Sequence, residues 1–469
     1  MNKFKPQQQA QLYLLPPSVE DFIPSGHLAR VVSEVVETLE VSSIEAKYSE
    51  LGQKSYAPRL IIKLLFYGYC IGIRSGRKIA AACESDTAFM YLASMYHPDF
   101  RTINDFRKDN IAFVEKAFIQ VVQLCRALGM AQAGTLIIDG TKLRANASPA
   151  KSRNKAEYEK WLLYIEKDIR KILEEAGQTD AEEDKQYGEN RGDELPEELR
   201  DKEKLKKKIE EALKQIKNED EKVNTTDADA KFIRSKQQTN LNYNCQAGIT
   251  EDRVIVSAFT TNNASDKRQL LPNIQQAEQN TDTTFNNILA DSGYASYDNY
   301  EALEVMNKTA FIPDQEKELE SEKQAQNPFH RNNFSYDEVN DQFICPQGKA
   351  LPLAGDYHNH ACKQKTKIYI GKECGHCLFL SQCSKGKARQ IHIEKREPLR
   401  HQARIRLDSN KGKQLYLKRM RIESVFGNLK QNLNYHQLQL RGTQKTNAEW
   451  QLICLAHNIK LIHQRKTVY

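Results

Sequence analysis

The sequence predicts an α/β fold in which a mixed sheet with flanking helices follows an all-helical N-terminal segment. Apolar residues recur at helical spacing through residues 20–130. At Thr135 the pattern changes to a short buried strand, and further strands alternate with helices up to residue 312. Two polar stretches, residues 149–224 and 313–398, interrupt this alternation and are predicted to be insertions.

The N-terminal helices are predicted from apolar spacing and from helix-start signals. Leu28, Val31 and Val35 lie on one face of a helix expected over residues 27–39. Two roles fit a compact helical segment with basic turns: DNA binding, and a scaffold or dimerisation face. Further helices are expected to begin at Pro58, at Ser75, at Asp86 or Thr87, and after the motif Phe100 to Arg107.

The remaining strands are predicted from short apolar runs bounded by turns. Residues 241–249 and 254–260 read as an antiparallel hairpin joined by Glu251 and Asp252. We therefore divide the chain into a helical N-terminal domain (1–130), a sheet core (131–148 and 225–312), a charged helical hairpin (149–224), a cysteine-bearing insertion (313–398), and C-terminal helices that complete the core (399–469).

The net charge is unevenly distributed along the 469 residues. The whole chain carries a formal +7, whereas residues 384–469 hold 19 Lys and Arg against 5 Asp and Glu. This basic end predicts a polyanionic partner, most simply nucleic acid, although solvated basic helices would give the same count. The apolar run over residues 60–73 is too short to span a membrane, and the N-terminus has no signal-peptide core. The cytoplasm is therefore the expected location.

Asp139 and Asp291 are the first candidates for a reactive site. Each follows an apolar strand and precedes a small residue, so each is expected at the end of its strand, where α/β sheets bind ligands. Two neighbouring buried carboxylates are unfavourable unless a cation neutralises them, and Mg²⁺ prefers such oxygen ligands. The alternative is that each Asp only caps the following turn.

A third acid lies on a helix expected near the C-terminus. Tyr416, Arg419, Glu423 and Lys430 recur at spacings of three, four and seven, so they share one helix face. Glu423 can join a metal site there, while Arg419 and Lys430 hold phosphates. The alternative is a surface helix with an Arg419–Glu423 ion pair.

These motifs together resemble the DDE transposases of bacterial insertion sequences. Tyr416-x2-Arg419-x3-Glu423-x6-Lys430 matches the Tyr-Arg-Glu-Lys signature of those enzymes without a gap. The residues around Asp139 resemble their first Asp motif. The residues around Asp291 resemble the second, and Thr102-x3-Phe106-Arg107 resembles the N-terminal domain of the insertion sequence 1182 type, related to the insertion sequence 4 and 5 groups.

The resemblance implies a ribonuclease-H-like core in which Asp139, Asp291 and Glu423 hold two Mg²⁺ (or Mn²⁺) ions. It implies hydrolysis of phosphodiester bonds at transposon ends, then attack of the freed 3′-hydroxyl on target DNA. The implied partners are double-stranded DNA, as terminal inverted repeats and target, and a second copy of the chain. The residues implied to contact DNA are Tyr416, Arg419, Lys430, Lys142 and Arg144. Two rival functions stay open: a catalytically inactive, domesticated transposase that binds DNA, and a nuclease without strand transfer.

Four cysteines in the second insertion predict a structural Zn²⁺ site. The Cys374-x2-Cys377 step lets two sulfurs reach one ion, and Cys345 and Cys383 would complete a tetrahedral set. The pattern is incomplete, because Cys345 and Cys383 do not belong to such pairs, and free thiols are the alternative. The substitute ligands are Cys362, His376 and His392.

Overall fold

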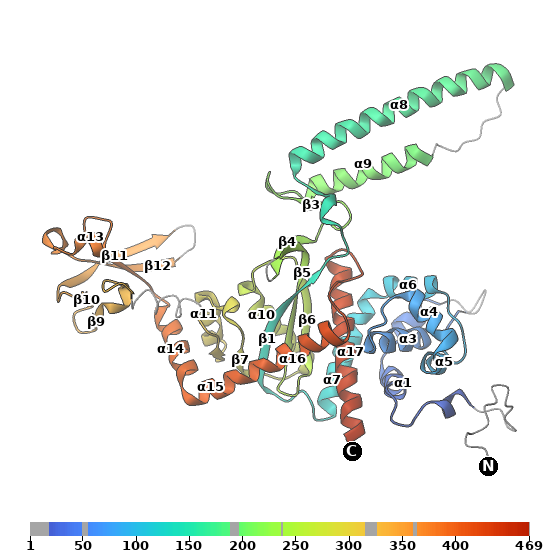
Figure 1. Ribbon diagram of the computed structural model, residues 1–469. Helices are drawn as coiled ribbons and strands as arrows, with labels where there is room; N and C mark the ends of the chain where they lie inside the picture. Colours follow the sequence, from blue (N-terminus) through green and yellow to red (C-terminus); the bar gives the residue numbers. More distant parts are fainter. Residues whose placement is uncertain are drawn as a thin grey trace, which may run out of the picture.

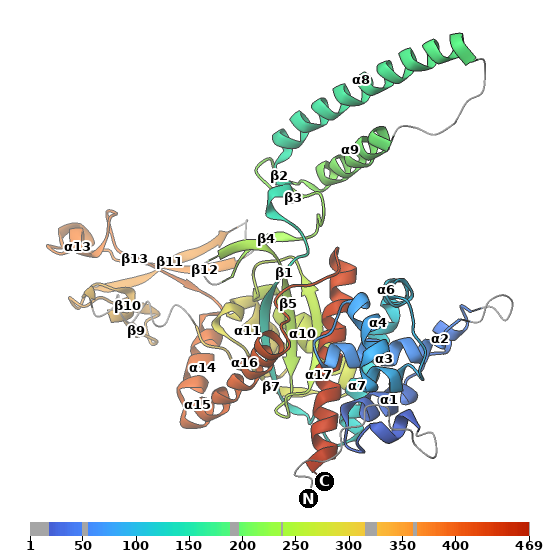
Figure 2. The same cartoon turned by 45° about the vertical axis from the view of Figure 1, so that its right-hand side comes forward.

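The computed structural model describes residues 18–48, 55–187, 197–235, 238–314, 326–359 and 364–468. Its body is mixed α/β, as predicted, with a curled sheet and many helices (Figure 1). A long helical arm and a small second sheet project from the body in different directions, and the turned view of Figure 2 shows the same separation. Within the described residues, no helix is long and apolar enough to cross a membrane.

The central sheet has six strands in the order β4-β5-β1-β7-β8, with β6 also paired to β5. β5 pairs antiparallel with β1, β4 and β6, whereas β1, β7 and β8 run parallel to one another. The predicted hairpin is confirmed as β5 and β6. The strands are β1 (Gly134–Arg144), β4 (Lys231–Ser235), β5 (Gln238–Ile249), β6 (Ile255–Thr261), β7 (Phe285–Leu289) and β8 (Thr309–Phe311).

The C-terminal helix α17 (Thr443–Val468) joins the sheet to the N-terminal helices. It is buried along most of its length, and the Trp450 indole donates a hydrogen bond of 2.8 Å to the carbonyl oxygen of Gln246 on β5. One apolar core runs without a break from the N-terminal helices through α17 to the sheet. The N-terminal helices are α1 (Leu28–Thr38), α2 (Ser42–Glu45), α3 (Pro58–Cys70), α4 (Gly76–Ser85), α5 (Thr87–Leu92), α6 (Phe100–Asp109) and α7 (Ile111–Ala127).

The arm consists of the two helices predicted from the charged stretch, α8 (Lys155–Tyr187) and α9 (Glu197–Gln215). At its base, β2 (Ser152–Arg153) pairs with β3 (Val223–Asn224). A small apolar cluster around Tyr158, Ile165 and Ile209 holds the two helices together. The arm therefore has its own contacts and adds nothing to the core of the body.

The cysteine-bearing stretch forms a five-stranded antiparallel sheet, β13-β12-β11-β10-β9. This polar stretch has a small core of its own. Phe334, Leu351, Tyr369 and Ile391 are buried together, and their apolar side chains are too scattered in the sequence to show a strand period. The strands are β9 (Ser335–Asp337), β10 (Gln342–Ile344), β11 (Ala350–Asn359), β12 (Gln364–Ile370) and β13 (Gln390–Glu394).

The remaining helices flank the central sheet. α10 (Leu270–Thr281) packs on β6 and α7, and α11 (Tyr297–Val305) packs on α14 (Glu397–Asp408). The helix expected over residues 416–430 is in fact segmented. α15 (Asn410–Tyr416) is followed by a 3₁₀ turn (Leu417–Arg419), by α16 (Met420–Gly427), and by a π-helical turn (Asn428–Asn432).

Candidate active site

The register of two parallel strands brings Asp139 and Asp291 together. Ile137 on β1 is the partner of Leu289 on β7. Each acid follows its paired residue by two positions, so both lie at the same level of neighbouring strands, which are spaced about 4.8 Å apart. Asp291 lies just past β7 and its carboxylate accepts a hydrogen bond of 2.9 Å from the Gly293 amide. Asp139 likewise accepts a bond of 2.8 Å from the Gly140 amide.

The expectation that Asp139 ends its strand is wrong. β1 continues to Arg144, and residues 137–144 all pair with β5. Beyond the acid, Thr141 and Leu143 are buried, which is the alternation of a strand with one covered face. Asp139 therefore projects from the middle of a paired strand, on a rigid backbone.

Arg419 connects Glu423 to the two aspartates. Its Nη2 lies 3.1 Å from Glu423 Oε1, and its Nη1 lies 3.6 Å from Asp139 Oδ2. Its Nε donates to the Tyr416 hydroxyl over 3.2 Å. Figure 1 shows α16 crossing the sheet next to β1, which explains how a residue so far along the chain arrives here. The predicted Arg419–Glu423 ion pair is therefore present, but it lies beside the aspartates and not on an unrelated surface.

Burial and mutual repulsion raise the pKa values of the aspartates. The pKa of Asp139 rises to about 7, first because the group is buried and then because Asp291 is near, against the opposing charge of Arg419. The pKa of Asp291 is also raised by burial, and Arg419 again opposes the shift. Burial raises the pKa of Tyr416 to about 12. A site that holds carboxylates at this cost is typical of catalytic centres and of cation sites.

Sequence reasoning missed a fourth acid, Asp266. Its negative charge also raises the pKa values of Asp139 and Asp291. It accepts hydrogen bonds from Lys142 Nζ (3.1 Å), from the Asn244 amide (2.6 Å) and from the Gln246 amide (2.8 Å). Asp266 stands before α10 in a polar loop without strand pattern, so no sequence signal singled it out. We call Asp139, Asp266, Asp291 and Glu423 the acid cluster.

A glycine after the first aspartate makes room for this network. A Cβ atom on Gly140 would lie 2.4 Å from the Gln246 amide nitrogen and 2.9 Å from Asp266. The buried Tyr294 hydroxyl donates to Gln246 over 2.5 Å. The small residue next to Asp139 therefore allows Asp266 and its partners to approach the strand.

The other predicted DNA-contacting residues are placed differently. Lys142 is paired with Asp266, and Lys430 Nζ lies 3.3 Å from the Lys142 carbonyl oxygen, so both lie along β1 close to the acids. Arg144 ends β1, about 17 Å along the strand from Asp139. It is exposed and does not join the acid cluster.

The orientation of these groups bears on metal binding. Among the described residues, no three or more His, Cys, Asp or Glu side chains are arranged so that they could hold a metal ion. In the acid cluster, the Arg419 guanidinium lies between Asp139 and Glu423. Its Nη1 atom is buried, and no hydrogen-bond acceptor in the described part of the chain meets it. A buried N–H donor without an acceptor, next to several carboxylates, fits a site in which bound cations replace the Arg419 guanidinium beside the acids.

The four predicted zinc ligands line one small cavity in the second sheet, of about 30 Å³, together with Phe334, Leu351 and Leu380. Cys345 Sγ accepts a hydrogen bond from the Lys349 amide and Cys374 Sγ accepts one from the Arg389 amide. Burial raises the pKa of Cys383 and the other three thiols add to the shift. We call Cys345, Cys374, Cys377 and Cys383 the cysteine cluster. Zinc binding by it stays a prediction, and the substitute ligand Cys362 lies outside the described residues.

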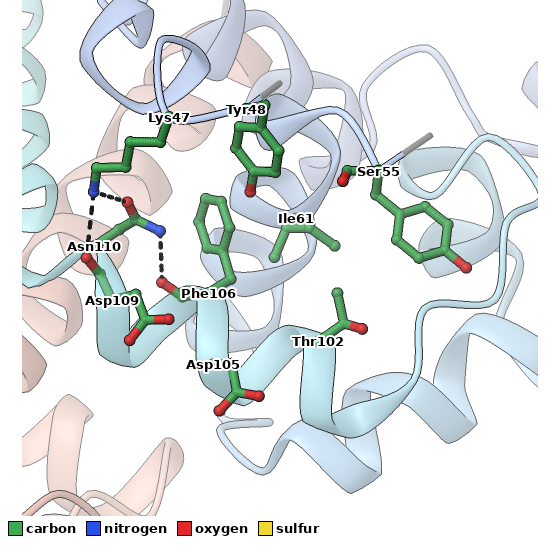
Figure 3. Close-up of a pocket in the computed structure, with 10 residues that line it drawn as sticks. Lys47, Tyr48, Ser55, Ile61, Thr102, Asp105, Phe106, Asp109 and Asn110 are labelled. Carbon is green, nitrogen blue, oxygen red and sulfur yellow. Dashed lines mark hydrogen bonds between the residues drawn. The ribbon is translucent and has the colours of Figure 1, made fainter. Parts of the chain in front are cut away.

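A larger cavity of about 500 Å³ lies in the N-terminal helices, far in sequence from the acids (Figure 3). At one end of it, Lys47 Nζ donates to the Asn110 side chain over 2.9 Å, and the Asn110 amide in turn donates to the Phe106 carbonyl oxygen. These contacts tie α2 to the end of α6. No member of the acid cluster lines this cavity.

Two family models match this chain. One, described as a transposase DDE domain, matches residues 344–463, and the other, described as a transposase domain (DUF772), matches residues 17–109. The first match includes Glu423 and the cysteine cluster, and the second includes most of the N-terminal helices. A comparison with curated proteins found no match. The two matches support a DDE-type insertion-sequence transposase, a class of nuclease and strand transferase that acts on DNA.

Proposed function

We propose that this chain is a DNA transposase of the insertion sequence 1182 type, with a ribonuclease-H-like core. Asp139, Asp291 and Glu423 would cleave the transposon ends and join the freed 3′-hydroxyl to target DNA. The observation that carries the proposal is the pairing of Ile137 with Leu289, which sets the two aspartates level on parallel strands. Arg419, which contacts both Asp139 and Glu423, ties the third acid to them.

The donor chemistry of the acids suits hard divalent cations, although in this structure Arg419 stands between Asp139 and Glu423. Asp139, Asp291 and Glu423 offer carboxylate oxygens, the ligands that Mg²⁺ and Mn²⁺ prefer. Bound ions would stabilise the charge that develops on phosphorus-bound oxygens and would acidify the attacking water or hydroxyl. With cations bound, the acids would no longer need the charge of Arg419. Its buried Nη1, which has no hydrogen-bond partner among the described residues, would then donate to a phosphate oxygen.

The residues around the acids have separate tasks in this proposal. Asp266 pairs with Lys142, which lies on β1 three residues after Asp139. The Tyr416 hydroxyl accepts from Arg419 and fixes its guanidinium, and Lys430 lies next to Lys142. Tyr416, Arg419, Lys430 and Lys142 would therefore orient the DNA backbone, whereas the acids would hold the reacting phosphate.

The test is strand cleavage with labelled duplexes from the DNA that flanks the gene, in the presence of Mg²⁺. Asp291→Asn keeps the acceptor oxygen for the Gly293 amide and removes the charge, so it should fold and lose cleavage by about a thousandfold or more, ~4 kcal/mol of activation free energy. Asp252→Asn, an exposed Asp in the turn between β5 and β6, is the matched control and should keep full activity. Equal activity of the two variants would contradict the proposed role of Asp291.

One observation favours a second candidate, a catalytically inactive DNA-binding protein. The Arg419 guanidinium already neutralises Asp139 and Glu423, as we would expect in a protein that does not bind metal ions there. This candidate predicts salt-sensitive DNA binding without any Mg²⁺-dependent cleavage. A joining assay with a labelled target duplex separates the transposase from a nuclease that lacks strand transfer.

A further inference from the structure

A cavity of about 530 Å³ lies between the N-terminal helices and the end of β1, away from the acid cluster. Four segments line it: the start of α4, one face of α6, a residue that follows β1, and the residues that precede α17. In both views α4 and α6 lie in the part of the N-terminal helices that is nearer to the arm (Figure 1 and Figure 2). The lining residues are Arg74, Ser75, Gly76, Arg77, Phe100, Asn104, Arg107, Asn146, Gln437, Leu438 and Gln439. We call this cavity the arginine pocket.

The pocket is positively charged. Three arginines line it, and no acidic residue does so among the described residues. One buried carboxylate contacts the wall: Glu449 Oε1 lies 3.5 Å from Arg74 Nη1, and the same carboxylate accepts hydrogen bonds from the backbone amides of Gln439 and Leu440. A single buried acid against three guanidinium groups leaves a net positive charge.

Two of the arginines are held rigidly by the protein. Arg74 donates to the Gln437 carbonyl oxygen over 2.6 Å and stacks on the Tyr435 ring at 4.8 Å. Arg107 donates to the Arg74 carbonyl oxygen, to the Tyr69 hydroxyl and to the Asn104 side chain. These contacts preorganise positive charge in the wall of the pocket, so little conformational entropy is lost when an anion binds.

Arg77 is the arginine that is available to a ligand. It is exposed, its guanidinium lies 4.8 Å from the centre of the Phe100 ring, and it makes no ion pair within the described part of the chain. An arginine supported on an aromatic face keeps its fork of donors open, which suits a phosphate group. Ser75 and Gly76, at the start of α4, add the positive end of that helix to the same wall.

The pocket is connected to the acid cluster by β1. Asn146 donates from the pocket wall to the Gln439 carbonyl oxygen over 2.7 Å, and it follows Asp139 by seven residues. An extended chain of that length spans about 23 Å, which is less than one turn of B-form DNA, about 34 Å. A single duplex can therefore reach both places.

We infer that the arginine pocket binds the phosphate backbone of double-stranded DNA, with Arg77 as the main contact. The inference rests on the proposed function in that DNA is the partner, but it does not need the acids to be catalytic. Contacts to phosphates position a duplex without reading its sequence. The pocket would thus hold DNA at a fixed distance from the acid cluster.

The test is DNA binding by the full chain in EDTA, so that no cleavage occurs, measured by fluorescence anisotropy with a labelled 30-bp duplex of arbitrary sequence. Arg77→Ala should weaken binding about fivefold and Arg77→Glu more, and Arg77→Ala should lower the slope of log K against log[KCl] by about 1. Lys78→Ala and Lys78→Glu are the matched controls, because Lys78 is the exposed neighbour on α4 and lies outside the pocket. They should stay within about twofold of the parent chain.

Each outcome decides the inference. Arg77 variants that bind no worse than the Lys78 variants, or that bind worse with an unchanged salt slope, would overturn it, because a lost phosphate contact must change both quantities. A drop in melting temperature common to all four variants would not alter the salt slope and so cannot imitate the expected result. If the parent chain shows no Mg²⁺-dependent cleavage, the proposed transposase activity is refuted, but the inference about DNA binding is unaffected.

Discussion

The acid cluster and the cysteine cluster are built in opposite ways. The four acids come from a strand, two loops and a helix that are spread between Asp139 and Glu423, and the core beneath them is continuous with α17 and the N-terminal helices. The four cysteines lie between residues 345 and 383, on a sheet whose core has four buried apolar side chains among the described residues. The first cluster therefore depends on the folding of the whole body, whereas the second depends only on its neighbours.

The two clusters also differ in how they manage charge. In the acid cluster, burial and repulsion raise the pKa values of Asp139 and Asp291, and Arg419 and Lys142 partly offset that cost. In the cysteine cluster, backbone amides donate to Cys345 and Cys374. Burial raises the pKa of Cys383 against the charge of Arg389, which lines the same cavity and donates to the Cys383 carbonyl oxygen over 3.0 Å. The buried acids of the acid cluster therefore destabilise the fold, as residues at many functional sites do.

The largest expected effect concerns Glu423, the most exposed member of the acid cluster. Glu423→Gln keeps the size of the side chain and removes its charge, so cleavage of a labelled transposon end should fall by about a thousandfold, ~4 kcal/mol. The side chain is 56% exposed, so the melting temperature should hardly change. A matched control is Glu304→Gln, on the exposed surface of α11. Cleavage that survives in Glu423→Gln would remove this residue from the site.

The second prediction tests how much the charge of Asp139 lowers the free energy of unfolding. The folded-state pKa of Asp139, about 7, lies above its unfolded value, so its ionisation destabilises the fold, and wild-type stability gains from this group as pH falls from 8 towards 4. Asp139→Asn should therefore raise the free energy of unfolding at pH 8 in EDTA by about 3 kcal/mol, and by much less at pH 5. Urea denaturation at both pH values measures this difference. A gain that is the same at both would show that Asp139 is not destabilising through its charge.

The site and the fold differ in how far the sequence could predict them. The helix starts at Pro58, Ser75 and Asp86 or Thr87, and the hairpin of β5 and β6, follow from local signals and were predictable. The continuation of β1 past Asp139 was not, because Thr141 and Leu143 are recognisable as strand residues only once β5 pairs with them. Asp266 was not predictable either, because its role comes from Lys142, Asn244 and Gln246, which only the folded sheet brings to it.

The cysteine-bearing sheet is a second region that the sequence predicted only in part. Its cysteines were visible as a pattern, but its core was not, because Phe334, Leu351, Tyr369 and Ile391 each stand in a different strand or loop among polar residues. Pairing of five short strands collects them into one layer. This core therefore arises from tertiary packing and could not be predicted from local apolar periodicity.

The third prediction separates this sheet from the body. Leu351→Ala removes the centre of its small core and should destabilise the sheet locally by about 2 to 3 kcal/mol, since Leu351 is 1% exposed. Limited proteolysis should then cut within residues 326–394, while the melting temperature of the body and DNA binding in EDTA stay unchanged. Leu353→Ala, whose side chain on the same strand is exposed, is the matched control. If the body melts earlier in Leu351→Ala, the two regions are not independent.

The smallest expected effect lies in the helix that joins the body together. Burial lowers the pKa of His457 on α17 to about 4, and its ring contacts the Arg253 carbonyl oxygen. The unfolded chain takes up a proton below about pH 6.5 and the folded chain does not, so this residue's contribution to stability is present above pH 6.5 and is lost as pH falls towards 4. His457→Gln should remove a slope of about 1.4 kcal/mol per pH unit between pH 6 and 5.

The measurement is urea denaturation followed by Trp450 fluorescence in a Trp161→Phe background, so that only the body is observed. Asp139 contributes in the opposite direction over the same range, and the difference between His457→Gln and its parent at each pH cancels that contribution. A parent and a variant with the same slope would show that His457 titrates alike in both states. A smaller slope in the variant would show that acidification weakens the body through α17, the helix on which the acid cluster, but not the cysteine cluster, depends.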